Sequence, residues 1–148
     1  MHRNRFYHKF YKSNLILGLI ILNYNYFEII FKIIIMPYYL YCILLENCQF
    51  SNNANKLLKQ YNIPYKLRYI SHDMKDIYKT EFIQSFPQIY LRKTYRSGTL
   101  LLGGYDNLNS IITNCINNKY NKNIEILKTN HWSEKAIYHL LDLIKKNI

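Results

Sequence analysis

Three short motifs carry the residue types that could do chemistry. They are Cys-Gln-Phe-Ser at residues 48–51, Ser-Phe-Pro at 85–87 and Gly-Gly-Tyr-Asp at 103–106. A cysteine at the start of a helix favours its thiolate, because free backbone amides and the helix dipole stabilise an anion. The thiolate is the species that attacks a disulfide. Since Ser51 stands where a second cysteine would complete a dithiol motif, Cys48 must be resolved by a thiol from outside.

The elements expected around these motifs alternate between strand and helix. Runs of aromatic and aliphatic residues predict strands, and an apolar stripe at i, i+3, i+4 and i+7 predicts the first helix. The expected order is strand 38–45, helix 51–61, strand 65–70, a helix over 74–83, a hairpin of strands 88–92 and 98–102, and a helix from Asp106, as its N-cap, to about residue 118. Two right-handed crossovers followed by a hairpin predict an α/β fold with a mixed sheet covered by helices.

Both ends of the chain extend beyond this pattern, which occupies a domain over residues 37–118. Residues 1–36 begin with basic residues and contain a hydrophobic stretch over 15–35 that polar and charged residues interrupt. Three interpretations of this extension stay open: a dispensable or mis-started segment, a membrane anchor, or another role. Residues 119–148 form a C-terminal extension in which Ser133 opens an amphipathic helix.

The three motifs, in this order and at these spacings, resemble those of the glutaredoxin family. Its members carry Cys-x-x-Cys or Cys-x-x-Ser, then Thr-Val-Pro or Thr-Phe-Pro, then Gly-Gly-x-Asp. The resemblance extends over residues 38–118, more than half of the chain. A lone cysteine is more often a small buried hydrophobe, but the ordered motifs together are specific. The resemblance implies a thioredoxin-like fold, a mixed four-stranded sheet with flanking helices, and glutathione as the substrate.

The resemblance also implies a role for each matching residue. Pro87 matches the proline that follows a cis peptide bond, and the exposed backbone of Phe86 would pair with extended glutathione. Asp106 matches the residue that holds the charged amine of the γ-glutamyl group, and Phe50 takes the aromatic place beside the thiol. The expected glutathione contacts are Phe50, Gln84, Phe86, Pro87, Gly104, Tyr105 and Asp106, with Cys48 as the catalytic nucleophile.

Two departures from the family pattern leave the reaction open. Leu45 stands where the family commonly has a lysine that binds the glutathione carboxylate, unless Lys56 or another base compensates. Gln49 replaces the glycine of the Cys-Gly-Phe-Ser motif found in monothiol members that hold an iron–sulfur cluster. The sequence therefore falls between the redox and the cluster-binding members of the family.

Three functions are compatible with these observations. The leading hypothesis is a monothiol glutathione-dependent disulfide oxidoreductase, in which Cys48 takes the glutathionyl group from a protein mixed disulfide. One alternative is a [2Fe–2S] carrier, in which two protomers each supply Cys48 and two glutathiones supply the other thiolates. The other is an interaction module with little catalysis. We expect a cytoplasmic monomer, with a dimer if a cluster is held and membrane association if residues 15–35 form an anchor.

The net charge, the cysteines and the histidines indicate which partners, compartment and metal sites to expect. The net charge of +11 is spread along a chain rich in Asn, Ile, Lys and Tyr, so no specific nucleic-acid partner is expected. Three cysteines form neither a disulfide framework nor a zinc-ligand pair, which favours a reducing compartment. Cys42 and Cys115 are predicted in the core, with Cys115 open as a distant resolving thiol. The scattered histidines predict no metal site.

Overall fold

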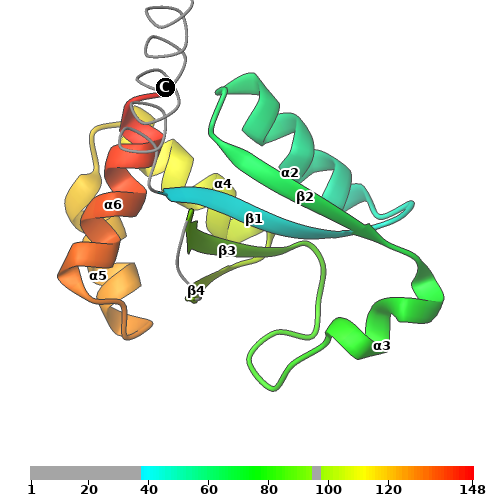
Figure 1. Cartoon of the computed structure of the whole chain (residues 1–148). Coiled ribbons are helices and arrows are strands. Elements are labelled where there is room, and N and C mark those ends of the chain that lie inside the picture. Colours follow the sequence, from blue (N-terminus) through cyan, green and yellow to red (C-terminus); the bar gives the residue numbers. More distant parts are fainter. Residues whose placement is uncertain (1–37, 95–97) are drawn as a thin grey trace, which may run out of the picture. The chain divides into compact units, whose positions relative to one another are not determined.

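A four-stranded sheet forms the centre of the part of the chain that the structure, a computed structural model, describes: residues 38–94 and 98–148 (Figure 1). In chain order the elements are β1 (Tyr38–Leu45), α2 (Gln49–Gln60), β2 (Tyr65–Ile70), the 3-10 turn η1 (His72–Met74), α3 (Lys75–Tyr78), β3 (Gln88–Lys93), β4 (Thr99–Gly103), α4 (Tyr105–Ile116), α5 (Tyr120–Thr129) and α6 (Glu134–Lys145). The extension predicted over residues 1–36 lies outside the described residues.

The strands are arranged in the order β2-β1-β3-β4 (Figure 1). Strand β1 pairs in parallel with β2 and antiparallel with β3, and β3 pairs antiparallel with β4. All four strands begin within one residue of their predicted positions. The prediction of an α/β fold with a mixed four-stranded sheet and flanking helices is therefore confirmed.

The core forms on one face of the sheet, because alternate residues of a strand point to opposite sides. Leu40, Cys42 and Leu44 of β1 are fully buried. They share a hydrophobic cluster with Leu58 of α2 and Leu108 of α4. Helices α2 and α4 also contact each other. This packing brings together the starts of the two helices on which the first and third motifs lie.

The helix predicted over residues 74–83 is wrong in its extent. The structure has the short turn η1 followed by the four-residue α3, which ends at Tyr78. Beyond it, the hydroxyl of Thr80 accepts hydrogen bonds from the N–H groups of Phe82 (3.3 Å) and Ile83 (3.2 Å). Such local side-chain bonds compete with the backbone pattern of a helix. The rest of the connection to β3 is therefore irregular.

Helix α5 occupies a polar stretch for which the sequence predicts no element. Its Asn123 is fully buried. The amide of Asn123 donates to the Ile111 carbonyl (3.0 Å) and accepts from the Asn114 amide (2.8 Å). Buried amides of this kind are stable only when they are hydrogen-bonded. The pair joins α5 to α4, and residues 38–148 form one compact unit.

Helix α6 begins at the predicted cap. The Ser133 hydroxyl accepts a backbone N–H from the first turn at 3.3 Å. The Trp132 indole donates to the Leu101 carbonyl of β4 (3.2 Å). The ring of His139 stacks on Tyr38 of β1, with ring centroids 4.1 Å apart. The C-terminal segment is therefore attached to two strands of the sheet.

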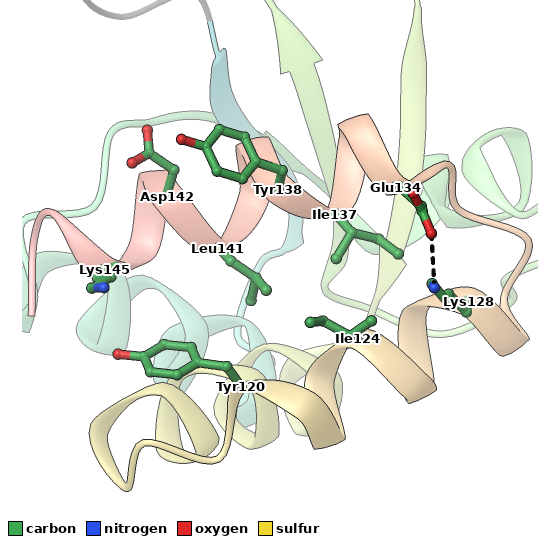
Figure 2. Close-up of a pocket in the computed structure, with 9 residues that line it drawn as sticks. All are labelled: Tyr120, Ile124, Lys128, Glu134, Ile137, Tyr138, Leu141, Asp142 and Lys145. Atoms are coloured by element: carbon green, nitrogen blue, oxygen red, sulfur yellow. Dashed lines mark hydrogen bonds and ion pairs between the residues drawn. The ribbon is translucent and has the colours of Figure 1, made fainter.

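A hollow of about 430 Å³ opens between α5 and α6 (Figure 2). Apolar side chains of Ile124, Ile137 and Leu141 line it, together with an ion pair between Lys128 and Glu134 (2.9 Å; Figure 2). None of the residues predicted to bind glutathione or to react lines this hollow. It therefore belongs to the C-terminal helices and not to the motifs.

No helix among residues 38–94 and 98–148 is long and apolar enough to cross a bilayer. The longest of them have 12 residues, whereas a spanning helix needs about 20. The stretch over residues 15–35, which the sequence leaves open as an anchor, lies outside the described residues.

Replacing Asn123 by alanine is expected to lower the free energy of unfolding by about 1–3 kcal/mol, because Asn114 and the Ile111 carbonyl lose a buried partner. The measurement is urea unfolding followed by circular dichroism. Asn121→Ala, at an exposed position of the same helix, is the matched control and should change the stability by less than about 0.5 kcal/mol. Equal losses in the two variants would contradict a role for the amide pair.

Candidate active site

Cys48 stands where the central strand β1 passes into helix α2. The strand ends at Leu45, the chain turns through Asn47 at φ 55°, and Cys48 is the N-cap of α2. Its backbone is extended (φ −97°, ψ 121°), while its carbonyl accepts a helical hydrogen bond from the Asn52 N–H at 3.0 Å. The side chain is partly exposed. The thiol is therefore accessible at the helix end that interacts favourably with negative charge.

Ser51, at the position of the absent second cysteine, is fully buried. Its hydroxyl oxygen accepts a hydrogen bond from the Leu45 N–H at 3.0 Å. Because this N–H lies at the end of β1, the bond ties the strand to the first turn of α2. Ser51 is therefore a positioning residue for the turn that carries Cys48.

The loop before β3 brings Phe86 and Pro87 to the thiol. The peptide bond between them is cis, as predicted. The Cys48 thiol donates to the Phe86 carbonyl, with 3.9 Å between sulfur and oxygen. No backbone carbonyl in the described part of the chain accepts the Phe86 N–H. An extended ligand beside the thiol would therefore meet a free backbone donor.

A buried amide holds this loop in place. Gln88, the first residue of β3, is fully buried. Its Nε2 donates to the Tyr78 carbonyl at the end of α3 (2.8 Å), and its Oε1 accepts from the Tyr90 hydroxyl (3.0 Å). Since both ends of the amide are hydrogen-bonded, Gln88 links α3 to the strand that follows Pro87.

Two glycines before α4 shape the opposite wall of the site. Gly103 has φ 125°, and a methyl group added at Gly104 would lie 3.6 Å from the Pro87 carbonyl oxygen. Gly104 is the N-cap of α4, and its N–H donates to Asn107 Oδ1 at 3.1 Å. The expectation that Asp106 caps this helix is therefore wrong, because the N-cap lies two residues earlier, at Gly104, and Asn107 supplies the capping bond. The Asp106 side chain is exposed in the first turn.

Most of the predicted site residues lie at the meeting point of α2, the cis-proline loop and α4. The Phe50 ring, which is 54% exposed, lies 6.2 Å from the Tyr105 ring. Gln84 is exposed and lines a hollow of about 700 Å³ with Gly104. This hollow also reaches residues 129–131, at the end of α5 and directly after it, and Cys48 does not line it. Gln84 therefore stands at the margin of the site, whereas the aromatic pair joins the starts of the two helices.

The other two thiols are sequestered, so that Cys48 is the accessible one. Cys42 is fully buried in β1, and this burial raises its pKa to about 12. Cys115 is 1% exposed on α4. Burial raises the pKa of Cys115, more than the hydrogen bond from Asn123 lowers it. The prediction that both residues belong to the core is confirmed, and neither presents a thiolate at neutral pH.

No group of three or more His, Cys, Asp or Glu side chains in the described residues is arranged to hold a metal ion. Thiolates commonly fill all four positions of a [2Fe–2S] cluster. One protomer offers the accessible Cys48 alone. The remaining thiolates would have to come from glutathione and a second protomer.

Sequence reasoning missed three positioning roles, those of Ser51, Gln88 and Asn107. The sequence did indicate a capping role for Asn107, because a side chain three residues after an N-cap can accept or donate a hydrogen bond at that cap. For Gln88 the sequence shows only a polar residue directly before the apolar run Ile89-Tyr90-Leu91 of β3. No pattern in the sequence indicated the bond between Ser51 and Leu45, because it depends on how the turn between them is folded.

The strand order, the cysteine at the start of α2 and the cis-proline before β3 define a thioredoxin-like domain of the thiol–disulfide oxidoreductase type. Residues 32–95 match the family model described as Glutaredoxin, which supports the thioredoxin-like fold. The matched residues include Cys48 and Pro87 and end before the Gly-Gly-Tyr-Asp motif at 103–106. No curated protein matches the chain.

Iodoacetamide is expected to modify one thiol of the native protein near neutral pH, because Cys42 and Cys115 are buried and protonated. Mass spectrometry of the intact chain gives the number of labels, and peptide mapping gives the position. Cys48→Ser should remove the label, and all three thiols should react after denaturation. Rapid labelling of a second thiol in the native state would contradict the assignment.

Gly103→Ala is expected to lower the free energy of unfolding by about 1–3 kcal/mol, because a side chain at φ 125° is strained and its Cβ would clash with Asn107. Gly104→Ala is the matched control, since its Cβ would make only an ordinary contact with the Pro87 carbonyl. Urea unfolding of both variants measures the difference. If Gly104→Ala loses more free energy of unfolding than Gly103→Ala, the close approach of Gly104 to Pro87, and not the turn at Gly103, is the stronger constraint.

Proposed function

We propose that the protein is a monothiol glutaredoxin that uses glutathione to reduce protein–glutathione mixed disulfides. The observation that carries the proposal is the accessible Cys48 beside the cis-proline loop, with its sulfur 3.9 Å from the Phe86 carbonyl oxygen. Ser51 is buried and bonded to the Leu45 N–H. The position that resolves the intermediate in dithiol members therefore holds a structural hydroxyl.

The reaction follows from the chemistry of one thiol. The Cys48 thiolate attacks the glutathione sulfur of the mixed disulfide, and the protein thiolate leaves and takes up a proton. Cys48 then carries the glutathionyl group through a disulfide bond. A second glutathione thiolate attacks the sulfur of that group, which releases glutathione disulfide and restores the Cys48 thiolate. One glutathione thiol is consumed: its electron pair forms the bond of glutathione disulfide, whose other half is the glutathionyl group of the substrate, and the protein sulfur leaves with the pair of the broken disulfide.

The residues around the thiol supply a binding mode for glutathione. The free N–H and the carbonyl of Phe86 lie where an extended peptide could pair with them, as in strand addition. The first turn of α4 offers the backbone N–H of Tyr105 to a carboxylate, whereas the N–H of Gly104 is already bonded to Asn107. The exposed Asp106 carboxylate would hold the ammonium group of the γ-glutamyl residue. The exposed Phe50 ring would cover the bound peptide, and Gln84 stands at the neighbouring hollow.

Leu45 leaves the site without the lysine that the family commonly has there. Lys56 does not replace it in contact with the thiol, because eight residues along α2 correspond to an axial distance of about 12 Å from Cys48. In this proposal the start of α4 therefore contributes more to binding the glutathione carboxylates than it would in a family member that has the lysine.

The test is a coupled assay of the full chain with a peptide whose cysteine is glutathionylated, with glutathione, glutathione reductase and NADPH. Turnover should depend on glutathione and fall to the uncatalysed rate in Cys48→Ser, because no other thiol is accessible. Cys115→Ser is the matched control and should retain turnover. Thermal melts of each variant establish that the protein is folded.

Absence of turnover in folded wild-type protein would overturn the enzyme proposal. A brown protein after anaerobic purification, whose colour disappears in Cys48→Ser, would instead support the [2Fe–2S] carrier. Loss of turnover in Cys115→Ser would show that Cys115 becomes exposed during the reaction and acts as a resolving thiol.

A further inference from the structure

The face of the sheet opposite the core carries tyrosines and cations side by side. Directly paired residues of neighbouring strands point to the same side of a sheet. Tyr41 of β1 pairs with Lys66 of β2 and with Tyr90 of β3, and Tyr39 pairs with Arg92. These positions alternate with the buried Leu40, Cys42 and Leu44 and so face away from them. The outer sheet face is defined by Tyr39, Tyr41, Lys66, Arg68, Tyr90 and Arg92.

The cations of the outer sheet face lie over aromatic rings. The Arg92 guanidinium carbon is 3.7 Å from the centroid of Tyr41, and the Lys66 amine is 4.7 Å from that of Tyr39. Arg92 Nε is buried without a hydrogen-bond partner among the described residues, and its guanidinium group stacks on the Tyr41 ring. Arg68 lies 5.3 Å from the Tyr78 ring of α3. The result is a set of planar groups interleaved with positive charge.

The outer sheet face is partly exposed to solvent, and its strands carry no negative charge. Lys66 and Arg68 are exposed, and the other members are partly exposed. The four strands contain basic residues but no Asp or Glu. On the short segment beside Arg68, Asp76 is paired with Lys79 at 2.7 Å. An anionic partner therefore meets no opposing carboxylate from the strands.

We propose that the outer sheet face binds single-stranded nucleic acid without base specificity. Phosphates would pair with Lys66, Arg68 and Arg92, and bases would stack on Tyr90 and on the guanidinium that covers Tyr41. A sheet that interleaves aromatic rings with cations suits an unpaired strand, because every base has a planar face. An acidic peptide or a lipid headgroup would use the charges but not the planar groups. Such binding does not distinguish one base from another. It is therefore compatible with the expectation that the protein has no specific nucleic-acid partner.

The test is fluorescence anisotropy of the full chain with a labelled oligothymidylate of about 20 nucleotides, long enough for more than one site. Binding should weaken as salt rises. The double variant Lys66→Ser/Arg68→Ser should weaken binding about tenfold or more and make the salt slope smaller by about one to two. Tyr41→Leu, which removes the ring under Arg92, should weaken binding about fivefold or more.

Matched controls separate this face from the net charge and from the thiol. Lys59→Ser/Lys122→Ser removes two exposed lysines from α2 and α5 and should leave affinity within about twofold. Cys48→Ser should bind normally, so that the outcome is independent of the redox proposal. Equal weakening by the two double variants would overturn the proposal. Binding to polyglutamate or to phosphatidylserine vesicles as tight as to the oligonucleotide, with Tyr41→Leu unchanged, would also overturn it.

Discussion

The alternation of side chains along the central strand β1 is the constraint on which the rest of the structure depends. Leu40, Cys42 and Leu44 are fully buried against the helices, so the residues between them must point to the other side of the sheet. A shift of one residue in register would exchange the two faces. The same strand ends three residues before Cys48, and its register therefore sets both the outer sheet face and the position of the thiol.

The candidate active site is built chiefly from backbone contacts between distant segments. The Leu45 N–H bonds to Ser51, the Cys48 thiol meets the Phe86 carbonyl, and Gly104 lies against the Pro87 carbonyl. In each contact one partner is a backbone group, which is present whatever the side chain at that residue. The departure at Leu45 is consistent with this arrangement, because the substitution leaves its own N–H free to hold Ser51.

The C-terminal helices show how buried polar groups extend the domain. The Asn114 and Asn123 amides join α4 to α5 inside the core, and the Trp132 indole reaches a carbonyl of β4. Each polar group is hydrogen-bonded, which removes most of the cost of burying it. The connection after α5 also forms part of the hollow beside Gln84 and Gly104. Residues that follow the predicted domain thereby border the candidate glutathione site.

The sequence by itself determined the four strands, the helices α2, α4 and α6, the reactive cysteine and the cis-proline, because hydrophobic period, caps and ordered motifs are local properties. It did not determine the early end of α3, where Thr80 bonds its own loop, or α5, whose buried face carries an asparagine. Only the tertiary structure decided the roles of Ser51 and Gln88 and the sequestration of Cys42 and Cys115. Those properties depend on which groups meet across the sheet and between helices, and partners distant in the chain leave no local pattern.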